Sequence, residues 1–127
     1  MIYSGTKLIC NDNSGALVVK CIGLKKSSKK RGAKIGDLII VSVKTCGRGI
    51  NWVKKGSIQH ALIVRLKINI NRFWKTANYL WFIQNNVVLV SLKNNLSPIG
   101  TRIFGPVAKE IWKPIFIKII LLSSGVF

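Results

Sequence analysis

The side chains that can transfer protons are few in this chain and stand far apart. The carboxylates are those of Asp12, Asp37 and Glu110, and the one imidazole is that of His60. General acid–base catalysis needs such groups within hydrogen-bond reach of one substrate, and no pair here has a spacing that nominates an acid and a base. Neither a GxxxxGK[ST] phosphate loop nor a glycine-rich dinucleotide fingerprint occurs. The sequence therefore predicts a protein that is not an enzyme.

Cysteine chemistry points the same way. Cys10, Cys21 and Cys46 are an odd number of widely spaced thiols without a CxxC pair, so neither a disulfide framework nor a zinc site is indicated. We expect buried or half-buried free thiols. The sequence predicts no metal site and no cofactor.

Positive charge is the strongest chemical signal. The chain has 21 lysines and arginines against 3 acids, a formal net charge of +18 on 127 residues, yet 49% of it is hydrophobic. A disordered basic tail lacks the apolar residues whose burial would offset the entropy of ordering. This composition therefore indicates a folded domain that binds a polyanion.

Two loops carry the densest charge. Residues 25–36 are polar and basic without apolar periodicity, and residues 46–56 form a second basic connection that contains glycine. Each lysine that neutralises a phosphate releases condensed counterions, so a cluster of lysines can bind RNA strongly. We therefore interpret these loops as RNA-binding rather than as a basic surface that only contacts water. We expect that both loops can lie at one end of the fold. The candidate RNA-binding residues in them are Lys25, Lys26, Lys29, Lys30, Arg31, Lys34, Arg48, Lys54 and Lys55.

Aromatic residues interleave with cations farther along the chain, a mixture that stacks on unpaired bases. Strand alternation would put Tyr79 and Trp81 on one face and Leu80 and Phe82 on the other, so only one set can meet RNA. An alternative function follows, that of a free-standing small-barrel protein that binds single-stranded nucleic acid. Further candidates for contact with protein or RNA are Arg72, Trp74 and Trp112.

Apolar alternation and turn residues predict the elements that position these loops. Ile39, Val41 and Val43 should form the buried face of one strand. Residues 68–79 are interpreted as an irregular hairpin. The predicted strands cover residues 7–11, 16–24, 37–45, 57–67 and 82–92. Short strands joined by turns at this density favour a closed barrel, which has no exposed sheet edge.

The C-terminal part has a different character. Pro106 suits the first position of a helix that runs to about residue 113, and Pro114 would end or kink it before a second helical segment over 115–122. The apolar run from Pro114 to Leu122 is interrupted by Lys118 and is about half the length that spans a bilayer, so no membrane insertion is expected. The predicted fold is mainly β, a small five-stranded β-barrel with basic loops and a C-terminal pair of short helices. We expect one domain over 1–127, with the barrel at about 1–95 and the turn and helices at about 96–127.

Four short motifs occur along the chain in a characteristic order. The stretches are NDNSGA at residues 11–16, GD at 36–37, VKKG at 53–56 and PIGTRIFGPVAKE at 98–110. In this order and spacing they closely resemble the family of the fourteenth universal protein of the large ribosomal subunit. The resemblance covers most of the chain.

The resemblance implies a structural constituent of the large subunit that binds its rRNA near the intersubunit face and supports subunit association in translation. Residues 27–34 match the family's basic rRNA-contacting loop, so Ser28 joins the candidate RNA-binding residues. Thr101 and Arg102 match the family's link into the C-terminal helices, and Arg102 is therefore a further candidate. The implied partners are small-subunit rRNA, neighbouring large-subunit proteins and a ribosome-silencing factor. The structural turn residues of the pattern are Asp12, Asn13, Gly15, Asp37, Gly100 and Gly105.

The chain departs from the family pattern in two ways. Between Arg65 and Phe82 the usual Asp-Gly turn is replaced by Thr76-Ala77, and Phe73-Trp74 are inserted nearby. Acids are also lost, especially around the C-terminal helices. Together with a composition rich in isoleucine, lysine and asparagine, this favours a mitochondrial ribosome, in the matrix, whose own genome encodes the protein. A plastid or the bacterial cytoplasm is the alternative location.

Overall fold

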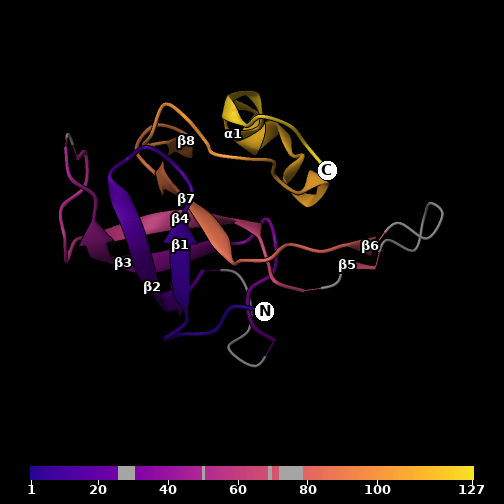
Figure 1. Ribbon diagram of the computed structural model, residues 1–127, viewed down its shortest axis with the longest axis horizontal. Helices are drawn as coiled ribbons and strands as arrows, with labels where there is room; N and C mark the ends of the chain where they lie inside the picture. Colours follow the sequence, from indigo (N-terminus) through magenta and orange to yellow (C-terminus); the bar gives the residue numbers. More distant parts are fainter. Residues whose placement is uncertain (26–30, 50, 69, 72–78) are drawn as a thin grey trace.

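Five strands form a closed β-barrel in the computed structural model, which describes residues 1–25, 31–49, 51–68, 70–71 and 79–127 (Figure 1). Each strand pairs antiparallel with the next in the order β1-β2-β3-β4-β7, and β1 pairs with β7. The predicted five-stranded barrel is therefore confirmed. Its strands are β1 (Lys7–Cys10), β2 (Ala16–Leu24), β3 (Leu38–Cys46), β4 (Ile58–Arg65) and β7 (Asn86–Ser91).

The barrel closes through a parallel pairing of its first and last strands. Ile9 lies opposite Asn86, and Cys10 opposite Val87. The amide of Ile9 donates to the carbonyl of Asn85 at 3.1 Å, and that of Asn11 donates to the carbonyl of Val87 at 2.9 Å. These bonds satisfy the backbone groups that an open sheet would leave at its edges.

Two small strand pairings lie outside the barrel, one that extends its sheet and one that forms a separate sheet. Strand β8 (Ser97–Pro98) pairs antiparallel with the end of β7. Strands β5 (Ile70–Asn71) and β6 (Tyr79–Leu80) pair with each other and project from the barrel (Figure 1). The hairpin expected over 68–79 is confirmed by this pairing, while residues 72–78 lie outside the described residues.

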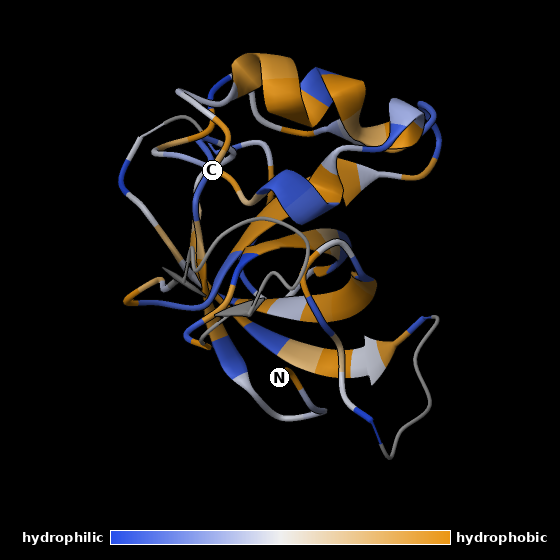
Figure 2. Cartoon of the chain, turned by 90° about the vertical axis from the view of Figure 1, so that its right-hand side faces the viewer, coloured by the Kyte–Doolittle hydropathy of each residue, from blue (hydrophilic) through white to orange (hydrophobic). Residues whose placement is uncertain are grey.

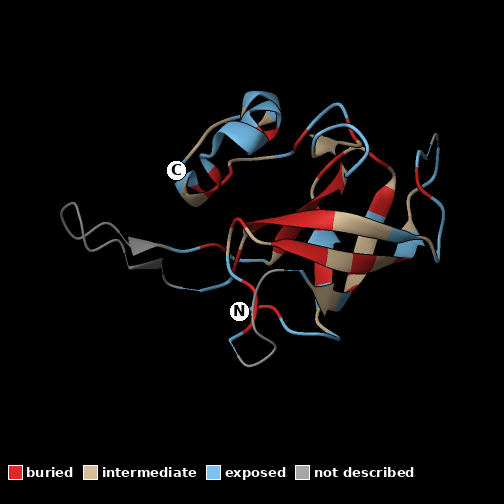
Figure 3. Cartoon of the chain, turned by 180° about the vertical axis from the view of Figure 1, so that it is seen from behind, coloured by how far each residue is buried: buried red, intermediate tan, exposed pale blue. Residues whose placement is uncertain are grey.

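Apolar side chains fill the inside of the barrel. Ile39, Val41 and Val43 are each 0% exposed, so the face predicted to be buried is confirmed. Their hydrophobic cluster includes Leu8 from β1 and Leu89 from β7. Figure 3 shows the buried positions concentrated on the strands.

A second apolar cluster lies on the opposite face of β4 and β7. Leu62 and Val64 from β4 and Val88 and Val90 from β7 belong to it, and the C-terminal segment packs against them. These two strands are therefore buried on both faces, which explains their continuous apolar runs, ALIV and VVLV. The residues contributed by the C-terminal segment are Ile103, Val107, Ile111, Phe116 and Ile119.

The C-terminal segment contains two short helical stretches, as predicted. The first is the 3₁₀ turn η1 (Lys109–Ile111), and the second is the 3₁₀ turn η2 (Pro114–Phe116) continued by α1 (Ile117–Leu122). Pro114 opens the second stretch, because its missing N–H costs nothing at a first helical position. Among the described residues, no helix is long and apolar enough to cross a membrane.

The start predicted for the first helix, Pro106, is wrong. Val107 is extended and forms a parallel bridge with Val126 near the end of the chain. Its amide donates to the carbonyl of Gly125 at 3.0 Å, and the amide of Phe127 donates to the carbonyl of Val107 at 2.9 Å. These bonds between distant parts of the chain override the local preference of proline for a helix start.

The outer cluster should contribute measurably to stability. We expect Ile119→Ala to lower the free energy of unfolding by about 2–4 kcal/mol in a urea titration, because Ile119 is 0% exposed and its loss leaves a cavity. The matched control is Ile117→Ala in the same helix, where the side chain is 53% exposed. Equal effects of the two substitutions would contradict the packing of α1 on the barrel.

Candidate nucleic-acid interface

A buried carboxylate organises the turn between β1 and β2. Oδ1 of Asp12 accepts hydrogen bonds from the Ser14 amide at 3.2 Å, the Ser14 hydroxyl at 2.6 Å and the Cys10 thiol at 3.2 Å. Its Oδ2 accepts from the amide of Leu89 in β7 at 3.0 Å. Asp12 is only 5% exposed, so these donors take the place of water. The carboxylate therefore fixes the turn and ties it to β7.

The next residue connects this turn to the segment that leads into the C-terminal helices. Oδ1 of Asn13 accepts from the amides of Thr101 at 2.7 Å and Arg102 at 3.0 Å. Its Nδ2 donates to the hydroxyl of Thr101 at 2.9 Å. Gly100 lies so close that a Cβ there would be 2.6 Å from the Asn13 Oδ1. The glycine thus permits the contact that positions Arg102.

The same turn also holds the second basic loop. The amide of Gly47 donates to the carbonyl of Gly15 at 2.8 Å, and the amide of Trp52 donates to the carbonyl of Ser14 at 2.9 Å. Gly15 has a φ of +102°, a conformation that favours glycine. The turn 12–15 therefore joins the loop over 47–56 and the segment over 100–102. The exposed candidate cations of these two segments are Arg48, Lys54, Lys55 and Arg102.

The first basic loop is anchored at the other end of β3. Asp37 accepts a hydrogen bond from the amide of Lys34 at 2.8 Å, which closes the turn that precedes the strand. The amide of Gly36 donates to the carbonyl of Ile63 at 2.9 Å, and Ala33 forms a bridge with Ile2. The exposed candidate cations here are Lys25, Arg31 and Lys34.

The expectation that both basic loops can lie at one end of the barrel is wrong. The first loop ends where β3 begins, at Leu38, and the second begins where β3 ends, at Cys46. A strand of 9 residues spans about 30 Å, since each residue rises about 3.3 Å. Successive connections of an antiparallel meander must alternate between its ends, and Figure 1 shows the described residues before β3 and those after it on different sides of the barrel.

The remaining candidates divide into those that are described and those that are not. Trp81 is 60% exposed and Phe82 is buried, so the predicted alternation is confirmed for these two residues. Trp112 is 64% exposed and thus faces away from the C-terminal packing. Six candidates lie outside the described residues, namely Lys26, Ser28, Lys29, Lys30, Arg72 and Trp74.

Burial shifts the pKa of two cysteine thiols and of the histidine. Cys10 and Cys21 are buried, and burial raises the pKa of each thiol; in Cys10 the nearby Asp12 carboxylate raises the pKa further. Partial burial lowers the pKa of His60, and the positive charge of Lys25 lowers it further. Neutral thiols and a neutral imidazole suit structural positions. Among the described residues, no group of three His, Cys, Asp or Glu side chains could hold a metal ion.

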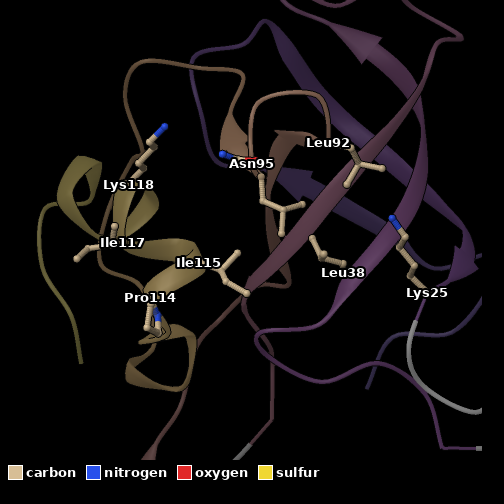
Figure 4. Close-up of a pocket in the computed structure, with 9 residues that line it drawn as sticks. Lys25, Leu38, Leu92, Asn95, Pro114, Ile115, Ile117 and Lys118 are labelled. Carbon is tan, nitrogen blue, oxygen red and sulfur yellow. The ribbon is translucent and has the colours of Figure 1, made fainter.

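A groove runs between the barrel and the C-terminal helices (Figure 4). Its volume is about 670 Å³, and apolar side chains such as Leu38, Leu92 and Ile115 line it between two cations, Lys25 and Lys118. The adjoining helix surface is apolar and exposed: Figure 2 colours α1 as mainly hydrophobic, and Leu121 is 77% exposed. An exposed apolar helix of this kind is typical of contact with another protein.

Arg65 is a further candidate that was not predicted from the sequence. This arginine ends β4 and is partly buried, and its Nη2 donates to the carbonyl of Phe104 at 3.0 Å. One feature of the sequence could have identified it: an arginine that stands directly between two apolar residues, Val64 and Leu66, at the end of a strand buried on both faces.

A small closed barrel with exposed basic loops and very few acids belongs to the class of proteins that bind nucleic acids. The model of the family described as Ribosomal protein L14p/L23e matches residues 1–127. The chain belongs to this family, and its role is that of a structural constituent of the large ribosomal subunit.

The Asp12 carboxylate should stabilise the fold more than a partly exposed acid does. We expect Asp12→Asn to lower the free energy of unfolding by about 2–3 kcal/mol, because one carboxylate oxygen becomes an NH2 group, which cannot accept the hydrogen bonds that this oxygen received and meets a donor instead. Asp37→Asn is the control, since Asp37 is partly exposed and accepts one hydrogen bond from the Lys34 amide. Urea titration measures both changes, and a smaller loss for Asp12→Asn would refute the central role of this group.

Asn13 should control the order of the segment around Arg102. In Asn13→Ala, the amides of Thr101 and Arg102 lose their acceptor, so we expect their hydrogen exchange to accelerate about tenfold or more. Exposed Asn94 is the control site for the same substitution. Unchanged exchange at Thr101 and Arg102 would show that Asn13 does not hold this segment.

Proposed function

We propose that the chain binds large-subunit rRNA through two basic sites at opposite ends of β3. The first site consists of the loop 25–36, and the second of the loop 47–56 with Arg102. The observation that carries this proposal is that every described candidate cation in them is exposed. Neither loop contains an acid, so RNA phosphates are the natural counter-charge.

The distance between the two sites determines how RNA can bind to them. Because β3 spans about 30 Å, a single short stretch of RNA backbone cannot occupy both sites with its neighbouring phosphates. The protein instead holds two separate segments of rRNA at a fixed distance. The barrel acts as the rigid spacer, and we propose that residues 1–127 form one domain in this role.

The C-terminal part faces other partners in this proposal. Its exposed apolar helix and the outward-facing Trp112 suit contacts with neighbouring large-subunit proteins, and the family resemblance adds a ribosome-silencing factor. By the same resemblance, the protein lies near the intersubunit face, meets small-subunit rRNA and supports subunit association in translation.

We place the protein in the mitochondrial matrix, as part of the mitochondrial ribosome. The support is the scarcity of acids, 3 among 127 residues, and the abundance of isoleucine, lysine and asparagine. A plastid or a bacterial cytoplasm is the alternative, and the same two RNA sites would serve there.

Salt dependence of rRNA binding tests the two sites directly. We expect the triple alanine variant of Lys25, Arg31 and Lys34, and that of Arg48, Lys54 and Lys55, each to flatten the plot of log binding constant against log salt by about two to three units. The combined variant should show the sum of both effects. Filter binding of the full-length protein to large-subunit rRNA measures these slopes.

The control variant removes the same charge from the C-terminal segment. Lys109, Lys113 and Lys118 are all exposed, and their replacement by alanine should change the slope by less than about one unit. If all three triple variants flattened the slope equally, binding would reflect net charge alone, and the assignment of the two loops would be wrong.

A further inference from the structure

Arg65 lies in an unusual setting for a cation. Its guanidinium lies against the backbone at Phe104 and Gly105, and a Cβ at position 105 would come within 2.9 Å of Nη1. The carbonyl of Phe104 accepts hydrogen bonds from Arg65 Nη2 and from the side-chain amide of Asn11. The glycine and the carbonyl together fix the plane of the guanidinium.

The charge of this arginine is only partly satisfied within the protein. Its Nε is buried and has no hydrogen-bond partner among the residues that the structure describes. Burial also lowers the pKa of the guanidinium, a sign that the charged form is incompletely solvated. A buried charged group with an unpaired donor is unfavourable, and a phosphate beside the accessible part of the guanidinium would compensate its charge.

A cavity opens beside Arg65 that could admit such an anion. Its volume is about 410 Å³, within the range of small-ligand sites, and no acid is among the described residues that line it. Trp81 is 60% exposed and Ile83 is 75% exposed, whereas Phe82 is buried. The cavity thus combines an oriented cation with an accessible indole. The described lining residues are Arg65, Trp81, Phe82, Ile83, Gln84 and Asn86.

We propose that this cavity, the Arg65 pocket, binds one unpaired nucleotide of rRNA. The guanidinium takes the phosphate, since arginine presents a planar array of donors that matches phosphate oxygens. The indole of Trp81 stacks on the base, which is how proteins commonly hold unstacked nucleotides. The amide of Gln84 can reach a base edge with either a donor or an acceptor.

A protein carboxylate is the competing ligand for the arginine, and two observations favour the nucleotide. An exposed indole next to a cation provides a flat surface for a base, which a carboxylate would leave unused. The chain as a whole carries +18, so phosphate is the anion that its surroundings supply at highest density. The inference rests on the proposed rRNA binding and adds a third contact to the two basic loops.

Photochemical cross-linking in intact large subunits tests the pocket. Irradiation at short wavelength should attach a nucleotide to the tryptic peptide over 76–93, and fragment ions should place it within residues 81–84. Arg65→Lys keeps the positive charge and leaves Trp81 in place as the photoreactive group. We expect this variant to lower the adduct yield about tenfold, because lysine cannot reproduce the arginine donor pattern.

Lys67→Ala is the matched control, since it removes an exposed charge two residues away and should leave the yield within about twofold. Full yield in Arg65→Lys would overturn the proposal. So would the absence of an adduct at 81–84 in the unsubstituted protein while peptides of the two basic loops carry nucleotides. Absence of adducts from the loops as well would instead contradict the proposed function.

Discussion

The carboxylate of Asp12 is the interaction on which the interface depends. It is buried, and its two oxygens accept hydrogen bonds from its own turn, from Cys10 and from Leu89 in β7. With the turn held in this way, Asn13 can bind the segment at Thr101 and Arg102, and Ser14 and Gly15 can bind the second basic loop. One acid thus positions cations that are far apart in the sequence.

The charge balance of the chain gives this acid its context. Like charges repel, so a net charge of +18 weakens the compact state until a polyanion neutralises it. Two of the acids perform defined backbone tasks: Asp12 fixes the first turn and Asp37 closes the turn before β3. Glu110 lies in the first turn of η1, where a negative charge is favourable. The RNA-binding proposal therefore makes the partner part of what stabilises the protein.

Local patterns predicted much of the barrel, and contacts between distant residues account for what they missed. Alternation in Ile39, Val41 and Val43 depends only on neighbouring residues, and it identified the buried face correctly. Pro106 was misleading because Val107 pairs with Val126, which no local pattern reveals. The positions of the basic loops followed from strand order rather than from charge. Arg65 was missed because its setting is created by Gly105, far along the chain.

Sedimentation of the tagged, full-length protein with large ribosomal subunits tests the central claim most directly, that the chain is an integral constituent held by rRNA. The account predicts that the protein stays with the large subunit through a wash at moderate salt and is released only at high salt, as phosphate contacts are screened. Release into the soluble fraction at modest salt would contradict it and would favour a free-standing single-strand binder.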